Sequence, residues 1–507
     1  MACARLLRAF AGELLMKTTH SALMLVCSGI AGIIWGGCGS DERIIFGNAP
    51  TTSSSSGSGA VGGDGGSGGA ADGGAAGMGG SGGAGGTGEA WPVKYDFLPV
   101  LQIDTNGVQI IEDVKVDGTL AVIVDHDGTL KDLASRPHVF DGPIGIEVRG
   151  SSSTGFPKNS FGMETRDALG QDTDVSFFGM PKESDWVLYG PYTDKTFMRD
   201  KLTYDLGRAL GRYAPRTQYV EVFVNNEYIG VYVFLEKIKR NSGRVNIPQV
   251  AADAATGDIT GGYIVKLEAG NPNGGFFSAA GTAWQYHYPR YDTITPEQDA
   301  YLQGYINSFE KVMLGANFAD PTKGYQALID VDSFVDFAII NELGRNVDGY
   351  RKSTYMYKQS DANGGRVYMG PIWDFNLAFG NADYCDGFRT DDFVYMGGNC
   401  SDIVDQIPDW WLFLMADPVF TKALRCRWES LRTGELSDAA ILQRIDAYRE
   451  EVKIAEPRDH ATWQTIGGYV WPNYFVGNSY GEEIDYMKQW LVERTAWLDV
   501  HLPGTCK

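Results

Sequence analysis

Two aspartates, Asp348 and Asp374, flank a segment whose residue types favour a β-hairpin. Residues 353–358 and the start of 366–372 are rich in β-branched and aromatic side chains, and the run between them ends in Asn363-Gly364-Gly365, a strong turn signal. The positions just before and just after an antiparallel hairpin lie at the same end, so we expect the two carboxylates to be close together. Converging carboxylates can hold a divalent metal ion or share acid–base work. The simpler alternative is that each aspartate caps a local turn.

A second candidate segment, residues 149–167, contains a loop of small hydroxyl residues followed by Lys158. Backbone N–H groups of such a loop, together with one ammonium group, can cover phosphates. A serine-rich surface turn beside a solvated lysine is the alternative interpretation.

The elements that must position these residues differ on the two sides of the hairpin. The first half reads as a mostly antiparallel sheet with one long helix within residues 185–211, and the second half reads as helical. The expected strands are 98–105, 120–127, 145–150, one after Lys158 within 149–167, one at the start of 185–211, a hairpin over 218–238, and 261–270. The expected helices are 296–314, 331–343, 409–431, 438–454 and 481–502. We therefore expect an α+β fold with a β-rich N-terminal part and a helical C-terminal part.

This layout is that of a two-lobed kinase. In such enzymes a catalytic-loop aspartate accepts the proton of the substrate hydroxyl, and a second aspartate after a short hairpin binds Mg²⁺. Asp348 and Asp374 stand at these two places, and Ser353 stands five residues after Asp348, where ordinary kinases have a metal-binding asparagine. The His-Arg-Asp, Val-Ala-Ile-Lys and Ala-Pro-Glu signatures of ordinary protein kinases are absent from the sequence.

Several spaced motifs carry a more specific resemblance. They are Arg149-Gly150-Ser151-Ser152 with Pro157-Lys158 and Phe161; Asp185-Trp186-Val187-Leu188 with Asp194-Lys195 and Arg199; Gly230-Val231-Tyr232 with Glu236; Asn346-Val347-Asp348 with Ser353; and Pro371-Ile372-Trp373-Asp374-Phe375 with Gly380. Together they resemble the spore coat protein H (CotH) kinase family of atypical protein kinases, over about residues 98–502. The resemblance implies an atypical, reduced kinase-like two-lobed fold and ATP- and Mg²⁺-dependent phosphorylation of serine on a protein substrate.

The resemblance also implies a role for individual residues. Asp348 corresponds to the catalytic aspartate and Asp374 to the metal-binding aspartate. The further candidates are Ser353 and Asn376 as metal ligands, Tyr368 against the adenine, and Lys158 and Arg149 as nucleotide-binding residues.

The net charge limits the classes of partner. The 507 residues carry a formal net charge of −21. Nucleic acids and anionic membranes are themselves negative, so this charge argues against both as binding surfaces. We expect a protein partner, no nucleic acid, and contact with a membrane only through a lipid anchor.

The N-terminal residues 1–38 are typical of an export signal. From Met16, an alternative start, one lysine precedes an apolar stretch that is short for a membrane span. The stretch ends at Trp35-Gly36-Gly37-Cys38, which resembles a bacterial lipobox in which Cys38 carries the lipid; ordinary secretion is the alternative. Residues 39–90 are rich in Gly and Ser and are typical of a disordered linker. We expect the kinase-like domain to span residues 91–507.

Four cysteines remain outside the export signal, an even number in a compartment expected to be oxidising. Of the three possible pairings we favour Cys385–Cys400 with Cys426–Cys506. Two functions stay open. The chain is either an exported protein kinase or a surface-displayed binding or adhesion lipoprotein that keeps the fold without phosphotransfer. The two aspartates favour the kinase, whereas the scarcity of ATP outside the cytoplasm favours the binding protein.

Overall fold

The computed structural model describes residues 91–507 apart from 269–273, 398–399 and 401–406. The expected export signal (1–38) and linker (39–90) lie outside the described residues. All described residues belong to one compact unit, Gly79–Lys507. No helix in this described part of the chain is both long and apolar enough to cross a membrane.

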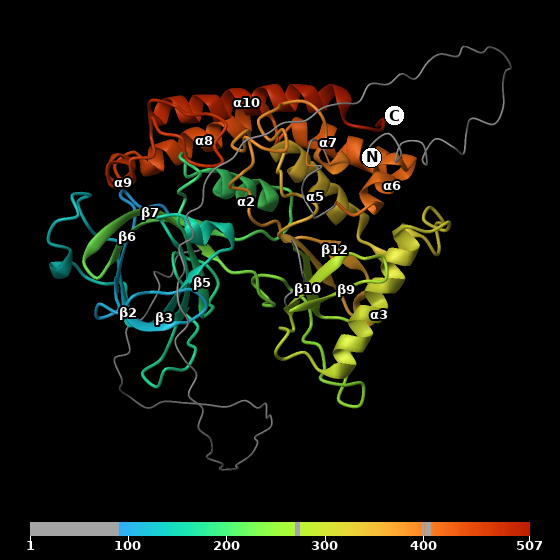
Figure 1. The fold of residues 1–507 in the computed structure, drawn as a ribbon, viewed down its shortest axis with the longest axis horizontal. Coiled ribbons are helices and arrows are strands. Elements are labelled where there is room, and N and C mark those ends of the chain that lie inside the picture. Colours follow the sequence, from blue (N-terminus) through green and yellow to red (C-terminus); the bar gives the residue numbers. More distant parts are fainter. Residues whose placement is uncertain (1–90, 269–273, 398–399, 401–406) are drawn as a thin grey trace, which may run out of the picture. The chain divides into compact units, whose positions relative to one another are not determined.

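The N-terminal part forms a closed barrel in the strand order β1-β2-β3-β4-β5-β7-β6 (Figure 1). The strands are β1 (Val100–Asp104), β2 (Val116–Ile123), β3 (Phe140–Arg149), β4 (Ser160–Thr165), β5 (Asp185–Tyr189), β6 (Thr217–Val224) and β7 (Glu227–Glu236). All neighbours pair antiparallel except β1 and β6, whose parallel pairing closes the barrel. Its interior is filled by alternating apolar side chains and by an aromatic group that includes Phe177, Trp186 and Phe234.

A second sheet has the order β12-β11-β8-β10-β9. Its strands are β8 (Tyr263–Leu267), β9 (Gly275–Phe277), β10 (Ala283–Tyr288), β11 (Thr354–Lys358) and β12 (Val367–Met369). The hairpin expected from the sequence is β11 and β12, with Met356 opposite Met369. The expectation of one mostly antiparallel sheet in the first half is wrong, because β8–β10 join this hairpin in a sheet separate from the barrel.

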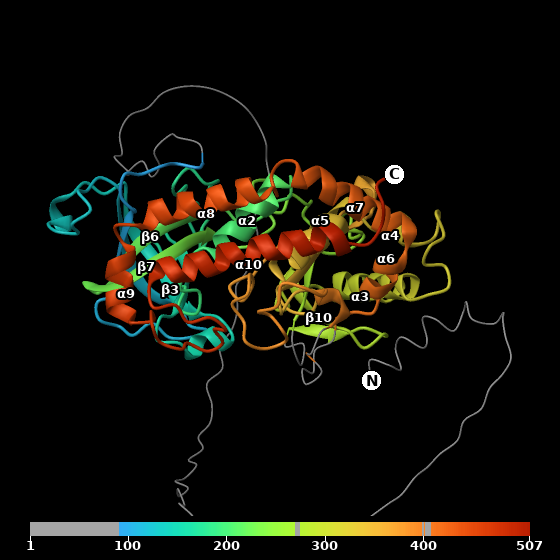
Figure 2. The same cartoon turned by 90° about the horizontal axis from the view of Figure 1, so that it is seen from above.

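The helices are α2 (Arg199–Ala209), α3 (Pro296–Met313), α4 (Tyr325–Leu328), α5 (Val331–Gly344), α6 (Trp410–Ala416), α7 (Pro418–Arg432), α8 (Asp438–Val452), α9 (Glu456–Trp463) and α10 (Tyr480–His501). Short 3-10 turns occur at η1 (Leu133–Ser135), η2 (Ser152–Gly155), η3 (Asp361–Asn363) and η4 (Val394–Met396). Helix α10 runs beside α8 and contacts α5 (Figure 2). The observed mixed α+β class, with a β-rich first half and a helical C-terminal part, is the one expected from the sequence.

Helix α5 is the central element for the site. Every residue from Ser333 to Gly344 is buried, as is typical of a helix that is packed on all sides. The side chain of Asp330 caps its first turn by accepting a hydrogen bond from the Ser333 amide, at 2.9 Å. The helix leads directly into the loop that carries Asp348, so its packing fixes where that loop begins.

The single helix expected over 409–431 is wrong, because the chain divides there into α6 and α7. Pro418 has no backbone N–H to continue the first helix. The preceding Asp417 instead caps α7, and its Oδ1 accepts hydrogen bonds from the amides of Val419 and Phe420, both at 2.9 Å.

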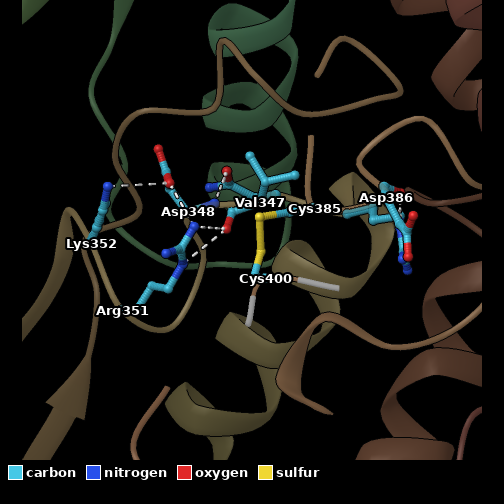
Figure 3. Close-up of a disulfide and its surroundings, with 9 residues drawn as sticks. Val347, Asp348, Arg351, Lys352, Cys385, Asp386 and Cys400 are labelled. Atoms are coloured by element: carbon cyan, nitrogen blue, oxygen red, sulfur yellow. Dashed lines mark hydrogen bonds and ion pairs between the residues drawn. A yellow bond between two sulfur atoms is a disulfide. The ribbon is translucent and has the colours of Figure 1, made fainter. Parts of the chain in front are cut away.

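Both expected disulfides are confirmed: Cys385–Cys400 and Cys426–Cys506. Figure 3 shows the first of them beside Val347, the residue before Asp348. Disulfides persist in oxidising compartments, so this pair indicates an extracytoplasmic protein.

Candidate functional site

The structure brings Asp348 and Asp374 together through one buried side chain. Asn346, 3% exposed, donates from Nδ2 to the backbone oxygen of Asp374 at 3.3 Å. Its Oδ1 accepts a hydrogen bond from the Asp348 amide, also at 3.3 Å. The loop after α5 and the loop after β12 are therefore joined at the residues that carry the two carboxylates.

Asp348 is half-buried and faces two cations (Figure 3). The Arg351 Nη2 atom lies 3.1 Å from its Oδ1, and the Lys352 Nζ atom lies 4.0 Å from the same oxygen. Arg351 is itself fixed, because its Nε and Nη2 donate to the Val347 backbone oxygen at 3.1 and 2.7 Å. This arrangement orients the carboxylate.

The Asp374 carboxylate remains accessible to solvent, and the Ser353 hydroxyl donates to its Oδ2 at 3.4 Å. Desolvation by the surrounding protein, followed by repulsion from Asp348 and Glu268, raises the pKa of Asp374 to about 6, against the opposing effects of Arg149 and Ser353. The two carboxylates therefore belong to one electrostatic site.

Glu268 is a site residue that the sequence did not identify. It follows β8, whose Leu267 pairs with Thr354 of β11, and this register places it near Ser353. The Lys266 Nζ atom lies 2.8 Å from its Oε2. A glutamate after a short strand carries no local signal of this role, because the strand pairing that places it is long-range.

The oxygen donors fit a magnesium ion that takes its other ligands from a nucleotide and water. Within the described residues, no three His, Cys, Asp or Glu side chains form a group that could hold a metal ion by themselves. Mg²⁺, however, is usually bound by one or two carboxylates plus substrate phosphates. Desolvation is the largest cause of the raised Asp374 pKa, and the repulsion from Asp348 and Glu268 that adds to it is the kind of unfavourable interaction that a divalent cation relieves.

Two other sequence candidates lie near Asp374. Arg149 stands at the end of β3, its Cζ 5.4 Å from the centre of the Trp373 ring, and its charge lowers the pKa of Asp374. Asn376 donates from Nδ2 to the Thr193 hydroxyl at 3.3 Å, so its side-chain nitrogen faces the turn before α2.

Lys158 is not the solvated surface lysine that was the alternative interpretation of its segment. It is 2% exposed and forms an ion pair with Asp459 of α9. Its Nζ also lies 5.3 Å from the ring centres of both Phe197 and Tyr232. Burial lowers the pKa of Lys158, and Asp459 opposes this effect. The sequence did not identify Asp459, which lies 301 positions away.

Tyr368 stacks on Tyr357 across the hairpin, with ring centres 5.0 Å apart. Tyr357 lines a cavity of about 160 Å³ between α2, α5 and residues 370–372. Much of its wall is apolar, including Leu210 and Phe337. The cavity is therefore a candidate for the apolar part of a ligand.

Comparison with known proteins agrees with these motifs. The sequence matches the family model described as CotH kinase protein over residues 146–498. It is 25% identical over 263 residues to the inner spore coat protein H of Bacillus subtilis (strain 168), a match that covers 49% of this chain and 64% of that protein. The chain thus matches slightly less than two thirds of this relative.

Among solved structures, the fold is similar to that of a Helicobacter pylori proinflammatory kinase, CtkA. The likeness has a TM-score of 0.26 and 11% sequence identity, and it covers 65% of this chain and 93% of that one. A likeness this distant carries no weight for function. The family match spans well over half of the sequence and includes both aspartates, so this chain belongs to the CotH kinase protein family.

Proposed function

We propose that this protein is an exported, lipid-anchored protein kinase that transfers the γ-phosphate of ATP to serine on a protein substrate. Family membership supports this proposal. The single observation that carries it is the joint placement of Asp348 and Asp374, tied by Asn346 and coupled in charge. A protein that only binds a partner has no chemical need for two such carboxylates in one solvent-accessible site.

In the proposed reaction the serine oxygen forms a bond to the γ-phosphorus, and the bond from that phosphorus to the β–γ bridging oxygen breaks, releasing ADP. Asp348 orients the serine hydroxyl and accepts its proton. Arg351 orients the Asp348 carboxylate by donating to its Oδ1. Most of the rate acceleration in such a site comes from positioning and charge.

Asp374 and Ser353 would hold Mg²⁺, with Asn376 as a further oxygen ligand. When bound, the ion neutralises charge on the phosphates. The ordinary asparagine five residues after the catalytic aspartate is replaced here by Ser353, whose hydroxyl already contacts Asp374. Glu268 adds negative charge to the same site.

The nucleotide side of the site is proposed to involve Arg149, Lys158 and Tyr368, within a two-lobed kinase-like arrangement of barrel and helices. Arg149 has the charge to contact phosphates beside Asp374. In protein kinases, the lysine that contacts phosphates is itself paired with a helix glutamate. The Lys158–Asp459 pair is comparable, because its acidic partner also comes from a helix, α9.

The test is labelling with γ-³²P-ATP and Mg²⁺, followed by identification of the phosphorylated residue. We expect the wild-type protein to label itself or an acceptor protein on serine, and Asp374→Ala and Asp348→Ala to lose labelling. Asp446→Asn, at an exposed aspartate of α8, should label as the wild type does. Equal labelling of wild type and Asp374→Ala, or phosphate on tyrosine alone, would contradict the proposal.

The anchor is tested separately. Cells that express the full chain should incorporate radiolabelled palmitate into it, and Cys38→Ser should abolish incorporation. Release of the wild-type protein into the medium without label would favour ordinary secretion. If labelling with ATP also fails in the purified protein, the binding or adhesion lipoprotein becomes the better account.

A further inference from the structure

The backbone of Asp374 has an unusual conformation and unusual support. Its φ angle is +65°, in the left-handed region that non-glycine residues seldom adopt. Its N–H donates to the Tyr204 hydroxyl at 3.2 Å, and its carbonyl accepts from Asn346. The next amide, of Phe375, donates to Asp200 Oδ1 at 2.6 Å. Side chains, rather than a helix or strand ladder, thus hold the peptide groups on both sides of Asp374.

Two of these side chains come from one face of α2. Asp200 and Tyr204 are four residues apart, so they lie one turn from each other on the helix. They are 5% and 2% exposed, so both side chains are buried. The Tyr204 ring also stacks on Trp373, with ring centres 6.0 Å apart. Tyr204 is therefore packed against the residue before Asp374.

The start of α2 and the turn before it also hold the segment that follows Asp374. Arg199 Nε donates to the Ala378 backbone oxygen at 3.0 Å. Asn381 Nδ2 donates to the Thr193 backbone oxygen at 3.1 Å. The segment from Asp374 to Asn381 is therefore held by the start of α2 and by the turn before it.

We propose that Asp200 and Tyr204 are positioning residues of the phosphotransfer site, which together hold Asp374 in its left-handed conformation and so aim its carboxylate at the metal. The effect on catalysis rests on the proposed function. The hold on the Asp374 backbone does not. Asp200 acts as a hydrogen-bond acceptor for a backbone amide. Its negative charge is not required for that role.

Four variants separate these properties. Asp200→Asn keeps an oxygen acceptor for the Phe375 amide and removes the titratable carboxyl, whereas Asp200→Leu removes both at similar size. Tyr204→Phe removes the acceptor of the Asp374 amide and keeps the ring that stacks on Trp373. Tyr219→Phe is the matched control, because Tyr219 is also buried and its hydroxyl donates to the Phe197 backbone oxygen, away from Asp374.

We call the hydrogen bonds from the Asp374 and Phe375 amides to Tyr204 and Asp200 the clamp. Hydrogen exchange of the peptide that contains Asp374 and Phe375 measures the clamp directly, without nucleotide or metal. We expect faster exchange of this peptide in Tyr204→Phe and Asp200→Leu, and wild-type exchange in Asp200→Asn and Tyr219→Phe. Unchanged exchange in Tyr204→Phe and Asp200→Leu, both folded by circular dichroism, would overturn the clamp, whatever the protein catalyses.

Two measurements give the functional readouts. Electron paramagnetic resonance measures Mn²⁺ binding in the presence of a non-hydrolysable ATP analogue, and the labelling assay gives kcat. We expect Tyr204→Phe and Asp200→Leu to lose about tenfold to a hundredfold in each, the range typical of residues that orient metal ligands. Asp200→Asn should stay within about threefold of the wild type, as its retained acceptor predicts. A large loss in Asp200→Asn with normal exchange would instead make Asp200 a metal ligand. If the wild type neither binds Mn²⁺ nor labels, the proposed function fails while the exchange result still decides the clamp.

Discussion

The buried ion pair between Lys158 and Asp459 gives the sharpest prediction for stability. Both residues are 2% exposed, and Asp459 Oδ1 also accepts the Val231 amide at 2.7 Å. Lys158→Met would leave a buried carboxylate without its counter-charge. Breaking a buried pair in this way costs about 3–5 kcal/mol of unfolding free energy. That is a large share of the roughly 5–15 kcal/mol available to a native protein.

A double-mutant cycle isolates the interaction energy between Lys158 and Asp459. Asp459→Asn keeps an acceptor for the Val231 amide, so the double variant Lys158→Met/Asp459→Asn contains neither charge. We expect it to cost roughly 2–3 kcal/mol less than the sum of the single changes. Lys453→Met, which breaks an exposed pair with Glu450, is the control and should change stability by less than about 1 kcal/mol.

The assay is urea denaturation followed by tryptophan fluorescence and circular dichroism. A cost below about 1 kcal/mol for Lys158→Met, or additive costs in the double variant, would refute the buried-pair reasoning. The same samples test the nucleotide role. If Lys158 contacts phosphates, labelling should remain low in the double variant even where stability recovers; if it only supports the fold, labelling should recover too.

Three further predictions follow from the structure. Removing the Cys426–Cys506 disulfide, which spans 80 positions, should lower the free energy of unfolding by about 4.5 kcal/mol in chemical denaturation. Removing Cys385–Cys400, which spans 15, should lower it by about 3 kcal/mol. The reverse order would contradict loop-closure entropy as the cause. Burial and the charge of Asp374 raise the pKa of Asp200 to about 8, so the folded state holds its proton more tightly than the unfolded state. The free energy of unfolding of the wild type should therefore fall, relative to that of Asp200→Asn, as pH rises from about 4 to 8. The slope is at most about 1.4 kcal/mol per pH unit. Parallel pH profiles of unfolding free energy for the two proteins would show that Asp200 does not titrate in this way. Finally, ATP with Mg²⁺ should raise the melting temperature of the wild type but not of Asp374→Asn, and equal shifts in calorimetric scans would place the nucleotide elsewhere.

The hairpin could be predicted from sequence because its signals are local. Two β-rich runs around Asn363-Gly364-Gly365 determine both the pairing and the end at which the aspartates meet. The longer helices followed from their apolar periodicity in the same way, whereas the short helices α4 and α9 were not expected. The break at Pro418 was also missed, because the apolar pattern continues on both sides of the proline.

Closure of the barrel could not be predicted, because it depends on the parallel pairing of β1 with β6 across the intervening strands. The same reason explains the missed site residues. Asp200, Glu268 and Asp459 gain their roles from partners distant in sequence, such as the Phe375 amide for Asp200. The spacing of Asp200 and Tyr204 on one helix face was visible in the sequence, but nothing in it indicated which backbone they would hold.

We propose that Asp348 and Asp374 act in one phosphotransfer site with separate roles. Isothermal titration calorimetry tests this division of roles. ATP with Mg²⁺ is titrated into the wild type, Asp348→Asn and Asp374→Asn. We predict that Asp348→Asn binds the nucleotide within about threefold of the wild type, because proton transfer is not needed for binding, and that Asp374→Asn binds it at least about tenfold more weakly. Equal affinities in all three proteins, or no binding by the wild type, would contradict the account.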